Sequence, residues 1–340
     1  MTYDEIISSI THELTGDPKK DIPYLKEQCD KYKDTEYGKE IVRACGRLLA
    51  NYLSDKDKET VVRELKNFDL GIDSTLEEVK FNQFQKNFNK ALELIEPLIK
   101  KIEEMCENGM YVDDKVSEYH CFNNLVEEVM YTYYNKVEKE QRASDIPYAS
   151  VYFQYGSLLI DLDRWEDAQK ALEKARRWNP SSANIILELC ETYKHLKQFD
   201  LFFETVKDTF KYCYEPHTLA RCYRALGWYF TEKELYEDAI AVYVLSLQFE
   251  PSDFVTSEMY YISQKSGKQF EHPDFEETKK VAEKYGIPIG AHEDVLGITY
   301  SLGKDAMEKD VKEAAKYFFN FFYQLTGNET VKELIDKLDN

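Results

Sequence analysis

Apolar side chains recur along most of this chain at the three- and four-residue spacing of amphipathic helices. One apolar face in the first third comprises Ile41, Val42, Cys45, Leu48, Leu49 and Tyr52. A second face comprises Phe81, Phe84, Phe88, Leu92, Ile95, Leu98, Ile99 and Ile102. The second face predicts a single long helix that Pro97 kinks. Because no segment carries the period-two alternation of a half-buried strand, the pattern predicts an all-α fold.

Two segments share a more detailed pattern. In each, an aromatic residue is followed by Gly, Ala, a bulky apolar residue, a small residue and Pro at the same intervals. The first segment has Tyr152, Gly156, Ala168, Leu172, Ala175 and Pro180, and the second has Tyr223, Gly227, Ala239, Tyr243, Ser246 and Pro251. Prolines at 147, 180, 216, 251 and 288 are separated by 33, 36, 35 and 37 residues. Because proline cannot continue a helix, this ladder predicts further hairpins between and beyond the two copies.

This pattern resembles the tetratricopeptide repeat (TPR), a helix–turn–helix unit of about 34 residues. The resemblance implies a right-handed superhelical α-solenoid over 111–340, clearest at 149–180 and 220–251, with a concave binding surface. Residues 1–110 are expected to form a helical N-terminal region, either a bundle or a diverged solenoid.

Three other stretches are expected to be divergent hairpins, namely 111–147, 183–216 and 252–288. A fifth unit is expected around Leu296 and Gly297, paired with Ala314 and Phe318, and with a longer turn than the clear copies have.

In this family, the second, fifth, ninth and twelfth positions of each repeat line the concave face. Carried onto this chain, these positions predict partner-binding residues at Phe153, Asn184, Leu187, Glu191, Lys194, Arg221, Arg224 and Trp228. Arg221 and Arg224 are one helical turn apart and lie beside Trp228. Two guanidiniums and an indole in this arrangement suit a carboxylate or an acidic peptide segment. The alternative is that both arginines pair with neighbouring acidic residues and that Trp228 packs on a hairpin.

Composition narrows the class of partner. The net charge of −20 disfavours nucleic acid and anionic membranes, which would be repelled. Seven cysteines without a C-x-x-C pair indicate reduced thiols in a cytoplasm, and the N-terminus lacks the pattern of a signal peptide. The Cys/His groupings lack a recognised metal-ligand spacing, and the sequence contains no phosphate-binding motif. No metal and no cofactor are therefore expected.

These observations predict a non-catalytic protein- or peptide-binding module that acts as scaffold, adaptor or regulator. A second hypothesis is a peptide-responsive regulatory sensor with an N-terminal effector bundle. A third is an enzyme with its site in 1–110. The aromatic run 318–323 is either a terminal helix buried on two sides or a homodimer contact.

Overall fold

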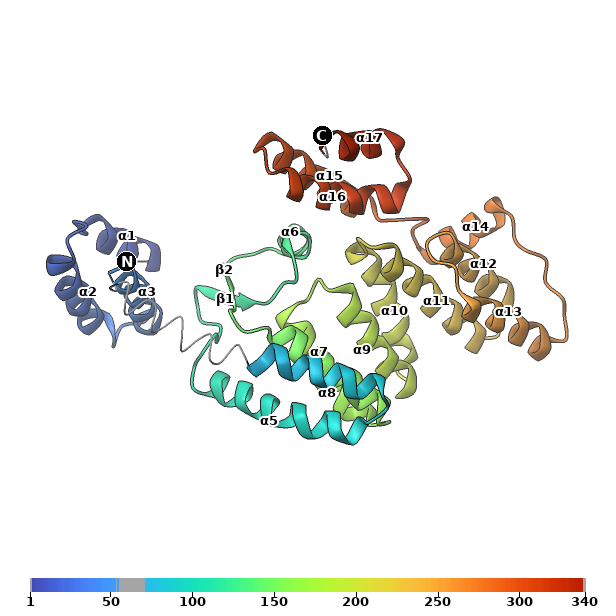
Figure 1. Cartoon of the computed structure of the whole chain (residues 1–340), viewed down its shortest axis with the longest axis horizontal. Helices are drawn as coiled ribbons and strands as arrows, with labels where there is room; N and C mark the ends of the chain where they lie inside the picture. Colours follow the sequence, from blue (N-terminus) through green and yellow to red (C-terminus); the bar gives the residue numbers. More distant parts are fainter. Residues whose placement is uncertain (1, 53, 55–70, 339–340) are drawn as a thin grey trace. The chain divides into compact units, whose positions relative to one another are not determined.

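The computed structural model of the chain describes residues 2–52, 54 and 71–338, and almost all regular structure in that part is helical (Figure 1). The expected helical class is therefore confirmed. The chain divides into two compact units, residues 1–121 with 137–147 and residues 122–136 with 148–340. The expected division into a helical region over 1–110 and a solenoid over 111–340 stays a prediction.

The first unit contains a short parallel strand pair that the sequence did not predict. Strands β1 (Ser117–His120) and β2 (Glu140–Ala143) pair over their whole length. Both strands are rich in polar residues, so no apolar alternation marks them. The expectation of a divergent helical hairpin over 111–147 is wrong for this reason, although that stretch also contains helix α6 (Leu125–Tyr134).

Three helices at the start of the first unit enclose a small core. They are α1 (Tyr3–His12), α2 (Pro18–Tyr32) and α3 (Gly38–Ala50). The core residues are Ile6, Ile10, Leu25, Ile41 and Cys45. The apolar face predicted around Ile41 and Cys45 is confirmed, because Leu48, Leu49 and Tyr52 pack against the same core.

The long helix predicted from Phe81 to Ile102 is wrong. Residues 71–84 are helical, a turn follows, and α5 (Phe88–Glu107) begins a new helix. Lys86 adopts φ 59° in that turn, so the apolar face is interrupted. Phe81 and Phe84 are consequently 63% and 83% exposed, whereas Ile95 and Ile102 on α5 are buried.

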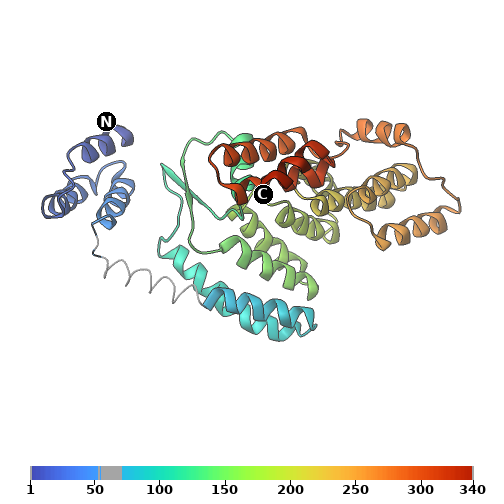
Figure 2. The same ribbon diagram turned by 45° about the horizontal axis from the view of Figure 1, so that its top comes forward.

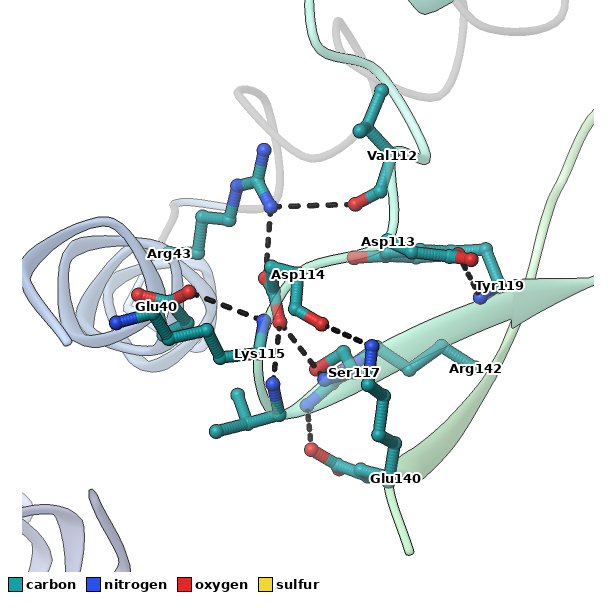
Figure 3. A network of polar contacts seen from close by, with 12 residues as sticks. Glu40, Arg43, Val112, Asp113, Asp114, Lys115, Ser117, Tyr119, Glu140 and Arg142 are labelled. Atoms are coloured by element: carbon teal, nitrogen blue, oxygen red, sulfur yellow. Dashed lines mark hydrogen bonds and ion pairs between the residues drawn. The ribbon is translucent and has the colours of Figure 1, made fainter. Parts of the chain in front are cut away.

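A polar network connects α3 to the loop before β1 (Figure 3). Arg43 donates to Asp114 Oδ2 at 2.8 Å and to the carbonyl oxygen of Val112 at 3.3 Å. The other Asp114 oxygen accepts the backbone amides of Val116 and Ser117. Burial alone would raise the pKa of Asp114, but Arg43 and the two amides hold that pKa below its ordinary value. Because Arg43 and Asp114 neutralise each other's charge, we assign this network a structural role.

The second unit is a series of helices that pack on their chain neighbours (Figure 1). After α6, its helices are α7 (Tyr148–Asp161), α8 (Trp165–Trp178), α9 (Ala183–His195), α10 (Phe199–Thr209), the short 3-10 helix η1 (Phe210–Tyr212), α11 (Pro216–Glu232), α12 (Tyr236–Leu247), α13 (Asp253–Ser266), α14 (Phe275–Tyr285), α15 (Glu293–Glu308), α16 (Lys312–Thr326) and α17 (Glu329–Leu338). Helix pairs α7–α8, α9–α10, α11–α12 and α15–α16 are closely packed hairpins.

These hairpins share one turn geometry, which also occurs between residues 84 and 88 of the first unit. One non-glycine residue in each turn has a left-handed φ between 55° and 61°, and these residues are Lys86, Asp163, Lys197, Glu234 and Asp310. The next residue donates its amide to a carbonyl oxygen five positions back, at 2.8–2.9 Å in every case. This hydrogen bond closes a helix C-terminus in the Schellman manner. The hairpins are therefore repeat-like in local geometry as well as in sequence.

Glycine allows the closest helix–helix contact in three of the hairpins. A Cβ built on Gly156 would lie 2.5 Å from Leu172, and one on Gly227 would lie 2.6 Å from Tyr243. In the last hairpin the equivalent contact joins Gly303 to Phe319, also at 2.6 Å. The alignment of the fifth unit on Gly297 is therefore wrong. Gly303 takes the glycine position, and the α15–α16 turn is of the usual kind.

The last part of the second unit departs from a simple array. Helices α13 and α14 do not form the expected hairpin over 252–288, because a connection over 267–274 separates them and α14 packs on α12. Helix α15 packs on η1, and on α6, beside which it lies in Figures 1 and 2. Within 318–323, Phe318, Phe319 and Phe321 are buried in their own chain. A homodimer through 318–323 stays a prediction.

A buried carboxylate joins three parts of the second unit. Glu127 on α6 accepts the backbone and side-chain amides of Asn123 at 2.8 and 3.1 Å. It also accepts the amide of Asn179, at the end of α8, at 2.7 Å and the hydroxyl of Tyr214 at 3.2 Å. Because both oxygens are fully hydrogen-bonded, this buried charge is compensated within the fold.

Candidate functional site

A pocket of about 140 Å³ opens between α9, α10, α11 and the start of α13. Its lining residues are Leu187, Glu191, Lys194, Phe202, Arg221, Arg224, Ala225, Trp228 and Phe254. The four residues on α11 follow one another at helical spacing, as do the three on α9, so each helix presents one face to the pocket. The pocket therefore combines three cationic side chains, one carboxylate and an apolar, partly aromatic wall.

Both arginines of the pocket are ion-paired through one terminal nitrogen. Arg221 Nη2 lies 3.0 Å from Glu188 Oε2, and Arg224 Nη2 lies 2.7 Å from Glu250 Oε2. Glu250 also accepts a hydrogen bond from His217 Nδ1, at 2.8 Å. Burial would raise the pKa of Glu250, but His217 and Arg224 together hold that pKa below its ordinary value. Glu250 is thus an anion that fixes Arg224 in place.

Arg224 retains an unused donor. Its side chain is 14% exposed, and its Nη1 atom is buried without a hydrogen-bond partner among the described residues. A buried N–H without a partner costs about 1–3 kcal/mol, and more where the group is charged. Such a group in a native structure calls for an explanation, and an acceptor supplied by a ligand is one.

Trp228 forms an aromatic wall beside the arginines. Its ring meets Phe202 edge-on at 5.2 Å between centroids and Phe199 at 5.9 Å. The ammonium group of Lys194 lies 4.7 Å from the indole centroid and 3.2 Å from Glu191. Trp228 therefore packs on the preceding hairpin and also holds a cation over its face.

The structure brings together six of the eight residues that the sequence predicted for the site. Leu187, Glu191, Lys194, Arg221, Arg224 and Trp228 all line the pocket. Phe153 is half-buried and packs against the core of the second unit, and Asn184 is half-buried in the first turn of α9. Neither Phe153 nor Asn184 lines this pocket.

Three lining residues were missed by the sequence reasoning. Phe202 and Ala225 belong to the helix–helix contacts rather than to groove positions. Phe254 is 49% exposed and is the second residue of α13, the position that Asn184 has in α9. Applying the groove positions of the repeat to α13 as well would have predicted Phe254.

The lining residues offer charge and apolar surface rather than a nucleophile beside a base. Within the described part of the chain, no group of three His, Cys, Asp or Glu side chains is placed to hold a metal ion. No helix in that part is long and apolar enough to cross a bilayer. No protein-family model matches the chain, and no curated protein shows a significant match.

Proposed function

We propose that this chain is a divergent TPR-like protein, a right-handed superhelical array whose α9–α11 pocket binds a carboxylate-bearing segment of a protein partner. It acts without catalysis, as scaffold, adaptor or regulator. The observation that carries this proposal is the buried, unpartnered Nη1 of Arg224.

The ligand chemistry follows from what that nitrogen needs. Because Nη1 of Arg224 is closed to solvent in this structure, the side chains around it must shift to admit a ligand. A carboxylate oxygen would then complete the hydrogen bonding of Arg224 with a charge-assisted bond. Glu250 holds the other edge of the guanidinium, so Arg224 is oriented before a ligand arrives. Preorganisation of this kind lowers the entropic cost of binding.

The aromatic wall suits the remainder of a peptide. Trp228 and the half-exposed Phe254 offer flat apolar surface next to the arginine. Tryptophan and arginine are the side chains most often found at the energetic centres of protein interfaces. A peptide with an acidic side chain next to an apolar one matches this pairing.

Two local features support the TPR-like assignment. The hairpin turns share one left-handed geometry, and Gly156, Gly227 and Gly303 occupy equivalent helix contacts. Stacked repeats of such hairpins expose concave surfaces to partners. The proposed location is a reducing cytoplasm, supported by an odd number of cysteines.

The proposal can be tested by affinity capture from a lysate of the source cells. Three forms are compared: the wild type, the variant Arg221→Ala/Arg224→Ala/Trp228→Ala, and the matched control Arg164→Ala/Arg177→Ala/Trp165→Ala. The control removes the same side-chain types from α8 and the residue before it, outside the pocket. Circular dichroism and thermal unfolding verify that each variant is folded.

We expect a protein that the wild type and the control retain and that the pocket variant loses. Capture of the same proteins by all three folded forms would contradict the assignment of the pocket as the binding site.

A further inference from the structure

A second concave surface lies between α6 and α15, apart from the α9–α11 pocket. It encloses about 480 Å³ and is lined by Val129 and Tyr133 of α6 and by Glu293, Asp294, Gly297, Ile298, Ser301, Leu302 and Asp305 of α15. The α15 residues recur at helical spacing, so one face of that helix forms a wall of the groove. From Asp294 to Asp305 the wall runs for about 16 Å, at 1.5 Å per helical residue. We call this surface the α6–α15 groove.

Carboxylates surround an apolar floor in the α6–α15 groove. Val129, Ile298 and Leu302 form the floor. Glu293 and Asp305 are exposed and form no ion pair with any described residue. Their charges are therefore not neutralised by any ion pair within the described part of the chain.

Asp294 is held in place by two tyrosines. The Tyr133 hydroxyl donates to Asp294 Oδ1 at 3.1 Å, and the Tyr134 hydroxyl donates to Oδ2 at 3.0 Å. The hydroxyls orient this carboxylate without cancelling its charge. Tyr133 is itself 61% exposed and contributes an aromatic edge to the groove.

Gly297 keeps the middle of the groove open. A Cβ built there would meet nothing within 4 Å, whereas one on Gly303 of the same helix would press on Phe319. Glycine inside a helix is destabilising relative to alanine, and packing within the chain explains Gly303 but not Gly297. A ligand backbone that approaches the helix closely would account for Gly297.

We propose that the α6–α15 groove is a second docking surface, which binds a basic segment of a protein partner that also carries apolar side chains. Charge complementarity identifies the occupant, because an acidic rim with unneutralised carboxylates favours lysine and arginine side chains and repels acidic ones. The floor accepts the apolar side chains. An extended segment of about five residues covers the length of the wall, at roughly 3.3 Å per residue.

The test uses a fluorescein-labelled, amide-capped pentapeptide of alternating arginine and leucine, titrated against the full chain by fluorescence anisotropy. The groove variant is Glu293→Gln/Asp294→Asn/Asp305→Asn. The matched control is Glu308→Gln/Asp310→Asn/Glu313→Gln, which makes the same change in net charge outside the groove. A further variant, Gly297→Leu, fills the groove and leaves every carboxylate in place.

We expect the groove variant and Gly297→Leu each to weaken binding of the basic peptide at least ten-fold, and the control to change it less than two-fold. Equal weakening by the groove variant and the control would mean general attraction to an acidic protein and would overturn the proposal. An unchanged affinity in Gly297→Leu, with helicity retained, would overturn it as well.

Discussion

Gly297 and Gly303 lie on the same helix but have opposite surroundings. Gly303 is buried where α15 and α16 approach most closely, and a methyl group there would lie 2.6 Å from the ring of Phe319. Gly297 faces space within the described structure. At the scale of single residues, the same amino acid therefore has a packing role at one position and none at the other.

Alanine at these two positions should change stability in opposite directions. Gly303→Ala forces the buried Phe319 ring to shift, and overpacking of this kind costs about 1–3 kcal/mol. Gly297→Ala lowers the entropy of the unfolded chain and should stabilise the protein by about 0.5–1 kcal/mol. Urea unfolding of both variants measures the difference. A loss of stability in Gly297→Ala would contradict the open space assigned to Gly297.

At the scale of elements, the connection between α1 and α2 depends on one buried carboxylate. Asp21 accepts hydrogen bonds from the amide and hydroxyl of Thr15, the amide of Gly16 and the hydroxyl of Tyr52. Burial would raise the pKa of Asp21, but these hydrogen bonds lower it from 3.8 to about 2. A carboxylate whose pKa is lower in the folded state stabilises that state above its unfolded pKa.

The first unit should therefore lose stability as the pH falls from about 4 through about 2, where Asp21 is protonated in the folded protein as well. Asp21→Asn should remove the part of this dependence that Asp21 contributes and leave the part from Asp114, whose pKa is also lowered, whereas Asp30→Asn, at an exposed position on α2, should leave both unchanged. The measurement is the urea midpoint of α1–α3 unfolding, followed by hydrogen exchange, between pH 5 and pH 2. A gap between wild type and Asp21→Asn that stays constant over this range would contradict the assignment.

The same scale shows why some elements could be predicted and others could not. Gly156 and Gly227 allowed their hairpins to be predicted, because the close helix contact needs a small residue on one helix and a large residue on the other. The turn at Lys86 carries no such signal, because its left-handed residue is lysine rather than glycine or asparagine. Strands β1 and β2 are short and polar, so no periodicity reveals them. The groove positions implied by the TPR resemblance predicted most of the pocket residues, and Phe254 was missed because those positions were not carried onto α13.

At the scale of the whole molecule, two kinds of surface lie on the second unit. The α9–α11 pocket presents Arg224, which has an unused donor, and the α6–α15 groove presents Glu293 and Asp305, which have no ion-pair partner among the described residues. A partner with separate acidic and basic segments could occupy both. The net charge is −20, and each cation of the pocket is already paired with a glutamate. Attraction of an acidic ligand would therefore depend on the specific hydrogen bond to Arg224 rather than on general charge.

The central claim is that Arg224 receives a carboxylate, and a selection from random dodecapeptides tests it most directly. Peptides retained by the wild type are sequenced and titrated against Arg224→Met, which keeps much of the length and apolar surface of the side chain. The account predicts enrichment of aspartate and glutamate among the retained peptides, with at least ten-fold weaker binding to Arg224→Met. Retained peptides without that enrichment, or with equal affinity for Arg224→Met, would contradict it.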